Sequence, residues 1–374
     1  MAVTLSTVAN QNIYGVRSAL PLGFATNSIG EKLRTIEIDL KIWNGDKVTN
    51  KPAAVTYSIV LGSNVLGTDL SYYEIDIAEL VREYIDTDNW ASLNPESYNS
   101  NWAAWVEIDW TSTSTEDGTF TGTPLIICTN GFRAYEDNTL ALDSYFFPSD
   151  VYLPDDMYYF ITILDTGVPG GSRVVDEIEI DYDNTGAVST ALGTAGTTTG
   201  SLFKTVALNW MGNDTKATVT LFLGPTLVAR FTVFRYCKTK YDNIAIGYVN
   251  RIGAVDHMYF FGKNEKRQTV SRETYKPVLN NNYNTGNAQF RVLSANGKQP
   301  FTANTDWVKE ETREKIRDLL LTEYAFETTA IPTSQTNKAV SVTDTEQTMK
   351  QDNNELSNYT INFEYAYNFI NSVR

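Results

Sequence analysis

The 374-residue sequence contains a single histidine, two cysteines and no long apolar run. With His257 alone, a metal site built on two histidines is excluded, and any serine–histidine–acid triad would have to use this residue. Cys128 and Cys237 cannot supply a disulfide framework, so apolar cores must hold the fold. No stretch reaches the ~18 apolar residues of a membrane span, and the N-terminal residues lack the pattern of a secretory signal. We therefore expect no membrane contact and assembly in a reducing cytoplasm.

Motifs for nucleotide and metal chemistry are also missing. The glycines in residues 167–171 lack the lysine and the helix start of a phosphate-binding loop. Asp181–Gly186 copies the first half of a calcium loop, but position twelve is Leu192, where a bidentate glutamate is needed. Acid pairs such as Asp155 and Asp156 are better interpreted as charges that protect strand edges than as a glycosidase pair. The sequence thus predicts no catalytic, cofactor-binding or metal site, and a protein that is not an enzyme.

Strand-forming residues are abundant. Hydrophobic residues make up 42% and aromatic residues 12% of the chain, a composition that favours folded β structure. The length suits more than one core. We predict a mainly β chain of two or three β-sandwich-like domains: an extended N-terminal arm over 1–30, a first sandwich over 31–165, a second β region over 166–240 and a C-terminal β domain over 241–374.

Two helices are expected among these strands. Asp76 and Glu79 resemble a capping box at the start of a short helix in the first domain. A longer C-terminal helix is predicted over 305–323, with Asn304 or Thr305 as its cap and an apolar stripe that includes Leu319.

The stretch from Tyr241 to Gly262 predicts a β-hairpin. Residues 243–250 alternate as a half-buried strand does, and Asn250 to Gly253 supplies a turn because asparagine and glycine tolerate positive φ. An aromatic return strand follows. Within this hairpin we assign structural roles to Asn250, Gly253, Asp256 and Tyr259, and we interpret His257 as a structural histidine.

The net charge of −15 is unevenly distributed along the chain. Residues 230–280 carry ten basic and four acidic residues, so this segment is +6 and the remainder −21. Such a dipolar chain suits head-to-tail contacts between copies, while solvated strand faces are the plainer alternative. Candidate subunit contacts come from this basic segment and from a Thr/Gly/Ala-rich loop at 184–200: Lys263, Lys266, Arg267, Arg272, Thr197, Thr198 and Thr199. The acidic total, and the absence of aromatic residues interleaved with the basic ones, disfavour nucleic acid as a partner.

Separated blocks of the sequence carry a family resemblance. Val249–Phe261 contains an asparagine–x–x–glycine–x–x–aspartate–aromatic pattern, and further blocks are 40–45, 75–81, 129–137, 301–307, 319–322 and 358–366. Together they resemble virion structural proteins of tailed phages that infect Bacteroidota, including crAss-like phages. Phe132 and Ala134 depart from the tyrosine and glycine expected there.

The resemblance implies a structural component of a virion tail, collar or portal-adjacent ring. Its partners would be further copies in a ring and other virion proteins, and its location would be the virion. A tail-associated adhesin or carbohydrate-binding module, with tyrosine and tryptophan side chains stacked on sugars, is the alternative. A third class, a hydrolase, would require two acids converging in a pocket.

Overall fold

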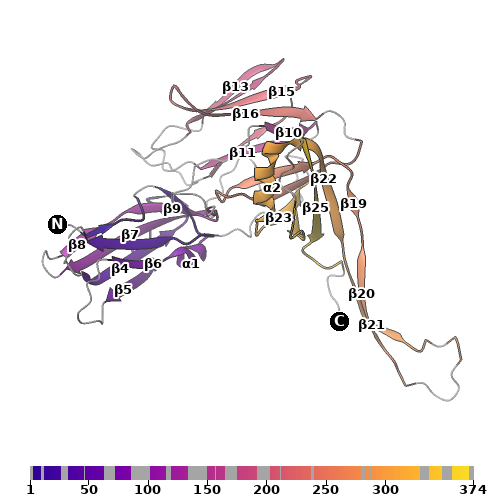
Figure 1. The fold of residues 1–374 in the computed structure, drawn as a ribbon, viewed down its shortest axis with the longest axis horizontal. Coiled ribbons are helices and arrows are strands. Elements are labelled where there is room, and N and C mark those ends of the chain that lie inside the picture. Colours follow the sequence, from indigo (N-terminus) through magenta and orange to yellow (C-terminus); the bar gives the residue numbers. More distant parts are fainter. Residues whose placement is uncertain are drawn as a thin grey trace.

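The computed structural model describes residues 3–9, 12–26, 33–45, 47–62, 72–85, 102–114, 119–133, 150–155, 157–164, 175–191, 203–210, 212–236, 240–278, 284–286, 288–328, 337–347 and 356–369. Within these ranges the chain is mainly β, as predicted, with one short and one longer helix. Figure 1 shows an N-terminal β unit, a second body of sheets beside it, and a two-stranded ribbon that projects from that body.

The N-terminal unit is a sandwich closed by a short helix. Its elements are β1 (Val3–Leu5), β2 (Ile13–Gly15), β3 (Pro21–Thr26), β4 (Leu33–Trp43), β5 (Tyr57–Gly62), β6 (Tyr72–Asp76), α1 (Ala78–Arg82), β7 (Ala103–Ser114), β8 (Thr119–Gly122) and β9 (Leu125–Thr129). The larger sheet has the order β2-β9-β7-β4-β5, with β8 also paired to β7, and the smaller one is β1-β3-β6. Alternation along β4 buries Ile36, Ile38 and Leu40 between the sheets.

The middle of the chain forms two sheets. Its strands are β10 (Asp150–Pro154), β11 (Tyr159–Leu164), β12 (Glu177–Tyr182), β13 (Gly186–Ala191), β14 (Phe203–Leu208), β15 (Lys216–Leu223) and β16 (Thr226–Tyr236). Five of them pair in the order β10-β16-β15-β12-β13, and β11 pairs with β14. Residues 150–164, which the sequence assigned to the first sandwich, therefore pair with strands of the second region.

The C-terminal part is a seven-stranded sheet with a helix packed on it. The elements are β17 (Ile244–Val249), β18 (Val255–Phe260), β19 (Glu265–Lys266), β20 (Thr269–Tyr275), β21 (Arg291–Lys298), β22 (Pro300–Lys309), the 3-10 turn η2 (Glu310–Thr312), α2 (Arg313–Leu320), β23 (Ala325–Thr328), β24 (Asn337–Val342) and β25 (Leu356–Tyr365). The sheet order is β18-β17-β23-β24-β25-β22-β19, while β20 and β21 form a separate ribbon.

Three apolar clusters hold these parts together. One fills the N-terminal sandwich, and a second runs without interruption through the middle and C-terminal sheets. The third lies between them, where Trp43, Trp102 and Trp105 of the N-terminal unit meet Phe203, Val255 and further apolar residues of the second body. Because this boundary is apolar and buried, it joins the two bodies through a packed interface.

The predicted N-terminal arm is wrong for the part of it that the structure describes. Strand β3 pairs with β1 on one side and with β6 on the other, and β2 pairs in parallel with β9. Leu20, Leu22 and Phe24 are almost completely buried in the sandwich core. These segments are short and small-residue-rich, so their strand pattern is weak, but pairing within their own chain buries their apolar side chains.

The long helix starts later than predicted. Residues 300–309 form β22, paired with β25, and helical structure begins only at the 3-10 turn. Phe301, Ala303 and Thr305 are buried on alternate positions, a strand period that the helical prediction overlooked. Asn304 is no helix cap: its Oδ1 accepts a hydrogen bond from the backbone N–H of Asp306 at a bulge, where Asp306 adopts φ 57°.

The short helix also begins differently from the predicted capping box. Asp76 Oδ1 accepts from the backbone N–H of Ala78, two positions on, and from that of Leu20, each at 2.9 Å. Ile77, the residue immediately before the helix, makes no capping hydrogen bond with its side chain. Asp76 therefore ties the helix start to the neighbouring strand segment.

Candidate functional site

The predicted hairpin is confirmed, and its turn is a tightly bonded structure. Strands β17 and β18 pair over six residues, and the turn runs from Asn250 to Gly253, which has φ 81°. Asn250 is buried and its Oδ1 accepts from the N–H groups of Ile252 at 3.1 Å and Ala254 at 3.0 Å. The asparagine side chain thus supplies the hydrogen-bond acceptor that these backbone N–H groups of a buried turn would otherwise lack. Both faces of the hairpin are buried, more than the half-buried strand expected.

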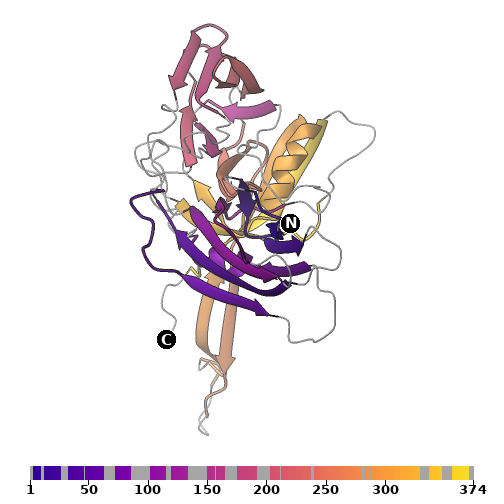
Figure 2. The ribbon, with the colours of Figure 1, turned by 90° about the vertical axis from the view of Figure 1, so that its left-hand side faces the viewer.

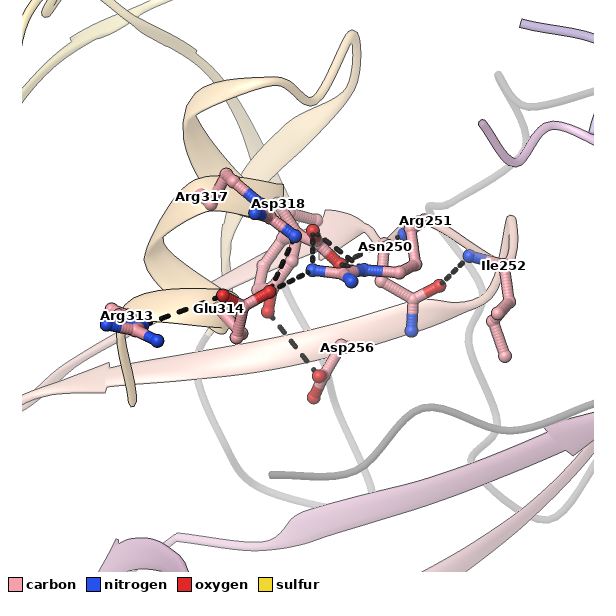
Figure 3. A network of polar contacts seen from close by, with 9 residues as sticks. Asn250, Arg251, Ile252, Asp256, Arg313, Glu314, Arg317 and Asp318 are labelled. Atoms are coloured by element: carbon pink, nitrogen blue, oxygen red, sulfur yellow. Dashed lines mark hydrogen bonds and ion pairs between the residues drawn. The ribbon is translucent and has the colours of Figure 1, made fainter. Parts of the chain in front are cut away.

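Arg251 fastens the turn to helix α2. Its guanidinium donates to both carboxylate oxygens of Asp318, with contacts of 2.9–3.1 Å, and to Glu314 Oε2 at 2.8 Å, and its backbone N–H also donates to Asp318. Figure 3 shows this fan of contacts, with Arg313 and Arg317 flanking Glu314. Burial raises the pKa of the Asp318 carboxyl, and the hydrogen bonds from Arg251 oppose that shift. The side chain of Asp318 is fully buried, so the pair is a structural clamp.

The N-terminal unit docks against the other side of the same turn. The backbone N–H of Phe132 donates to the carbonyl of Arg251 at 2.8 Å. Gly253 approaches so closely that a Cβ there would lie 2.8 Å from the backbone nitrogen of Gly131 and 2.8 Å from Thr129. Arg17 and Arg82 of this unit both form ion pairs with Glu323, just beyond α2.

Three of the blocks behind the family resemblance therefore meet in space. The block at 129–132 contacts the turn at Arg251 and Gly253, and Thr322 of a C-terminal block accepts a hydrogen bond from the N–H of Val249 at 3.1 Å. These segments are far apart in sequence, and each contributes backbone or short polar groups. We call this junction, made of residues 129–132, 249–254 and 314–323, the hub.

A buried ion pair lies under the hub. Lys315 Nζ is 3.0 Å from Asp256 Oδ1 and 3.1 Å from the hydroxyl of Tyr159, and both charged side chains are nearly inaccessible. Asp256 also accepts from the backbone N–H of His257 at 2.7 Å and from the Tyr248 hydroxyl. Burial, with the nearby Asp256 charge, raises the pKa of Tyr159 and Tyr248 well above the usual value. Both phenols therefore stay protonated: the Tyr248 hydroxyl donates to Asp256, and the Tyr159 hydroxyl accepts from Lys315.

His257 occupies the same buried region and is neutral. Burial, followed by the charge of Lys315, lowers its pKa to about 3. Its ring lies against Phe160 and Phe326, with centroids 4.9 and 6.1 Å away, and Nδ1 has no hydrogen-bond partner among the described residues. The predicted structural role of Tyr259 is similar: it is buried and its hydroxyl donates to the carbonyl of Tyr158.

A small pocket opens beside this cluster. It is lined by Asp150, Tyr152, His257, Thr312 and Lys315 among others, and it has a volume of about 20 Å³. That volume accommodates about one water molecule, whereas pockets for small-molecule ligands typically enclose about 300–1,000 Å³. Among the described residues, no three or more His, Cys, Asp or Glu side chains gather in a group that could hold a metal ion.

The segment that copies a calcium loop is a turn between β12 and β13. Asp183 accepts from the backbone N–H and the hydroxyl of Thr215, and Asp214 accepts from the N–H groups of Asn184 and Thr185 and from the Thr185 hydroxyl. The hydroxyl of Thr215 lowers the pKa of Asp183. The two aspartates thus lock neighbouring turns to each other.

The ribbon β20–β21 is a separate two-stranded sheet that is exposed to solvent. All seven residues of β20 are exposed, and the ribbon extends away from the sheets in both views (Figure 1; Figure 2). Its base is tied to the body by the N–H of Phe369, which donates to the carbonyl of Gly297 at 2.7 Å. Large apolar side chains remain exposed along it and beyond its strand ends: Val270, Tyr275, Val278, Phe290, Val292 and Leu293.

Pairing register separates the ribbon into two faces. Val270, Arg272 and Thr274 lie opposite Gly297, Ala295 and Val292, so these six residues share one face. We call it the apolar ribbon face, with Arg272 as its one charge. The opposite face is polar and includes Glu273, whose carboxylate accepts from Ser294 at 3.1 Å. An isolated two-stranded hairpin is at best marginally stable in water.

The predicted contact residues divide into two groups. The contacts of Lys266 are made within its own chain. Its Nζ forms an ion pair with Glu327 at 3.0 Å and lies over the rings of Phe301 and Tyr365. Arg267 pairs with Glu265 at 2.7 Å, but both side chains are largely exposed. Lys263 and Arg272 are exposed, and Arg272 lies on the ribbon. Thr197, Thr198 and Thr199 lie outside the described residues.

Sequence reasoning missed the apolar residues of the ribbon. The basic charge of residues 230–280 dominates the sequence here and obscures the apolar residues among them. A usable signal was present, since Thr269–Tyr275 and Arg291–Leu293 are rich in β-branched and aromatic residues on either side of an asparagine-rich turn.

Comparisons with known proteins give no family assignment. No family model matches the sequence, and no curated protein matches it. Among solved structures, the periplasmic chaperone SfaE is 12% identical over 63% of this chain and all of its own, with a TM-score of 0.21. The trypsin-activated and native forms of α2-macroglobulin from Escherichia coli are each 10% identical over 81% of this chain, with TM-scores of 0.23. The chain spans only 19% and 18% of those two macroglobulin chains.

No helix among the described residues is long and apolar enough to cross a bilayer.

Proposed function

We propose that this chain is a structural component of a tailed-phage virion, of the type found in crAss-like phages, and forms part of a tail, collar or portal-adjacent ring through subunit–subunit contacts. The observation that carries the proposal is the projecting ribbon, which exposes Val270, Val292 and Leu293 outside the three apolar clusters of the described residues. A chain that acts alone gains nothing from such an element, whereas an assembling subunit uses it to bind a neighbour.

The hub supports the same function. A subunit in a ring transmits force between neighbours, so its domains must hold a fixed relative orientation. Here an apolar interface, the Arg251–Asp318 clamp and the ion pairs of Glu323 all fix the N-terminal unit to the second body. Three of the blocks that resemble phage structural proteins also converge here, which supports a link between the resemblance and this junction.

The proposal also includes the absence of catalysis. The acids and the lysine near the pocket are engaged in ion pairs and hydrogen bonds, and the pocket has room for about one water molecule. The function we assign to the chain is therefore mechanical and adhesive.

Electron microscopy of purified phage particles tests this function. We expect the chain to be traced in density as a symmetric ring in fixed copy number, with each ribbon seated on a neighbouring chain. Its absence from particles, verified by mass spectrometry of the same preparation, would contradict the proposal.

A carbohydrate-binding tail component is the second candidate, and Trp307 favours it. The indole is 56% exposed and follows Asp306, the one described residue other than glycine with positive φ. An exposed tryptophan at a bulge can stack on a sugar ring. Glycan-array binding that is lost in Trp307→Ala, in a chain that stays monomeric, would support this candidate over the ring subunit.

A further inference from the structure

We propose that the apolar ribbon face of one copy docks on the outer face of the large N-terminal sheet of the next copy. This inference rests on the proposed assembly function and names the surface that receives the ribbon. It makes the contact head-to-tail, because the two surfaces differ. Contacts of that kind close into rings when the rotation between copies allows it.

The ribbon supplies a basic surface with an apolar centre. Residues 269–298 carry four basic residues and one acidic residue, which gives +3, while the rest of the chain carries −18. Of the basic residues, Lys298 pairs with Glu364 of the same chain. On the apolar ribbon face, Arg272 lies between Val270 and Val292 and has no ion-pair partner among the described residues. Seven residues of strand span roughly 23 Å.

The receiving surface is the face of β4 and β7 that points away from the sandwich core. It carries Glu37, Asp39 and Asp109, whose chain neighbours Ile36, Ile38 and Ile108 are completely buried on the opposite face. Asp39 and Asp109 are direct cross-strand partners, an arrangement in which like charges destabilise a sheet.

The acidic charge of this face is not balanced within the described chain. Glu107 on the same face has Lys41 at 3.4 Å and Lys51 at 2.5 Å. Glu37, Asp39 and Asp109 have no basic partner among the described residues; Asp109 accepts only from the Thr123 hydroxyl at 3.2 Å. A guanidinium placed between Asp39 and Asp109 would remove their repulsion, so this face gains from a cationic partner.

Shape and position agree with the charges. The outer stretch of β4 from Thr35 to Lys41 is seven residues long, as is β20, and Val60 on the adjacent strand adds an exposed apolar side chain. The N-terminal unit and the ribbon lie at opposite ends of the long axis (Figure 1). A ribbon therefore reaches this face on a neighbouring chain.

Sedimentation of the purified full-length chain and of two surface variants tests the contact. The first variant, Arg272→Ala/Val292→Ser, removes the ribbon contacts, and the second, Asp39→Lys/Asp109→Lys, reverses the receiving face. We expect each variant alone to associate about tenfold or more weakly than the unmodified chain. An equimolar mixture of the two should form a heterodimer and stop there, because one intact ribbon meets one intact face.

The matched control is Glu179→Lys/Asp181→Lys, which makes the same change in net charge on β12. It should associate as the unmodified chain does. Circular dichroism verifies that each variant is folded, and Asp39→Asn/Asp109→Asn replaces the reversed variant if that one unfolds.

Several outcomes would overturn the docking contact. They are an unmodified chain that stays monomeric, a control as weak as the variants, a mixture that forms no heterodimer, or association that nuclease treatment abolishes. Particle electron microscopy separates the two levels of inference. A ribbon seated on a different virion protein refutes this contact and leaves the proposed function intact, whereas self-association of a chain absent from particles does the reverse.

Discussion

Gly253 is required by both backbone conformation and space. Its φ of 81° disfavours any residue with a Cβ, and that Cβ would also overlap Gly131 and Thr129 of the N-terminal unit. Gly253→Ala should lower the free energy of unfolding by at least about 2 kcal/mol, measured by urea denaturation. Gly224→Ala is the matched control, since φ is 55° there and nothing lies within 4 Å of the added Cβ. An equal loss in both variants would show that the close approach at Gly253 contributes nothing.

His257 makes stability depend on pH. Its folded pKa of about 3 lies below the ordinary unfolded value, so between about pH 6.5 and 3 the unfolded chain binds a proton that the folded chain does not. The contribution is fully present above pH 6.5 and is lost as the pH falls, by up to about 1.4 kcal/mol per pH unit. Lys315 and Asp256, whose side chains form an ion pair, are the charged groups that face the same region.

The measurement compares unfolding free energies at pH 7 and pH 5 for the unmodified chain and for His257→Phe. We expect the difference between the two pH values to be about 2 kcal/mol smaller in the variant, because phenylalanine cannot bind the proton. The new ring would lie among Phe160 and Phe326. Identical pH dependence in both proteins would mean that His257 is not held neutral in the folded state.

At the scale of elements, helix α2 is fastened to the β17–β18 hairpin by a few charges. Asp318 is fully buried and accepts four hydrogen bonds from Arg251. Asp318→Asn removes the charge that compensates the half-buried guanidinium and should cost about 2–4 kcal/mol of stability. Asp181→Asn, at an exposed carboxylate on β12, should change it by less than about 0.5 kcal/mol. Thermal and urea unfolding measure both, and a small effect at Asp318 would mean that Glu314 alone suffices.

The hairpin could be predicted because its information is local. Asn250 and Gly253 are residue types that a turn demands, and the flanking strands have strong β propensity. The same sequence could not show that Arg251 meets Asp318 or that Gly253 meets Gly131, since those contacts join segments far apart in the chain. The structural role of the turn residues was thus accessible, while their partners were not.

The predicted start of helix α2 was wrong because residues 300–309 carry both helical and strand sequence signals. A candidate cap at Asn304 or Thr305, followed by an apolar stripe, predicts a helix start, yet the alternation of Phe301, Ala303 and Thr305 belongs to a strand. Pairing with β25 and burial in the large core decided between the two, and both are tertiary effects. Lys315 on this helix is buried beside Asp256, which no local pattern in the sequence indicates.

At the scale of the whole molecule, the packed junction between the two bodies is separate from the exposed ribbon. The hub and the tryptophan-rich interface fix two bodies to each other, while the ribbon stands outside all three apolar clusters. An assembling subunit benefits from this separation, because its contact element can adapt to a neighbour without disturbing the cores.

That separation predicts that the ribbon can be shortened without unfolding the chain. Joining Ser271 to Asn296, which are cross-strand partners, through an Asn-Gly turn would remove Val292 and Leu293 but keep the base that contacts Phe369. The unfolding free energy should change by less than about 1 kcal/mol, because the described residues among those removed belong to none of the three apolar clusters. Self-association measured by sedimentation should disappear in the same variant.

Trp307→Ala, which removes an exposed side chain away from the ribbon, should associate normally. A shortened chain that unfolds would place the ribbon within the fold itself, and one that still associates would place the subunit contact elsewhere.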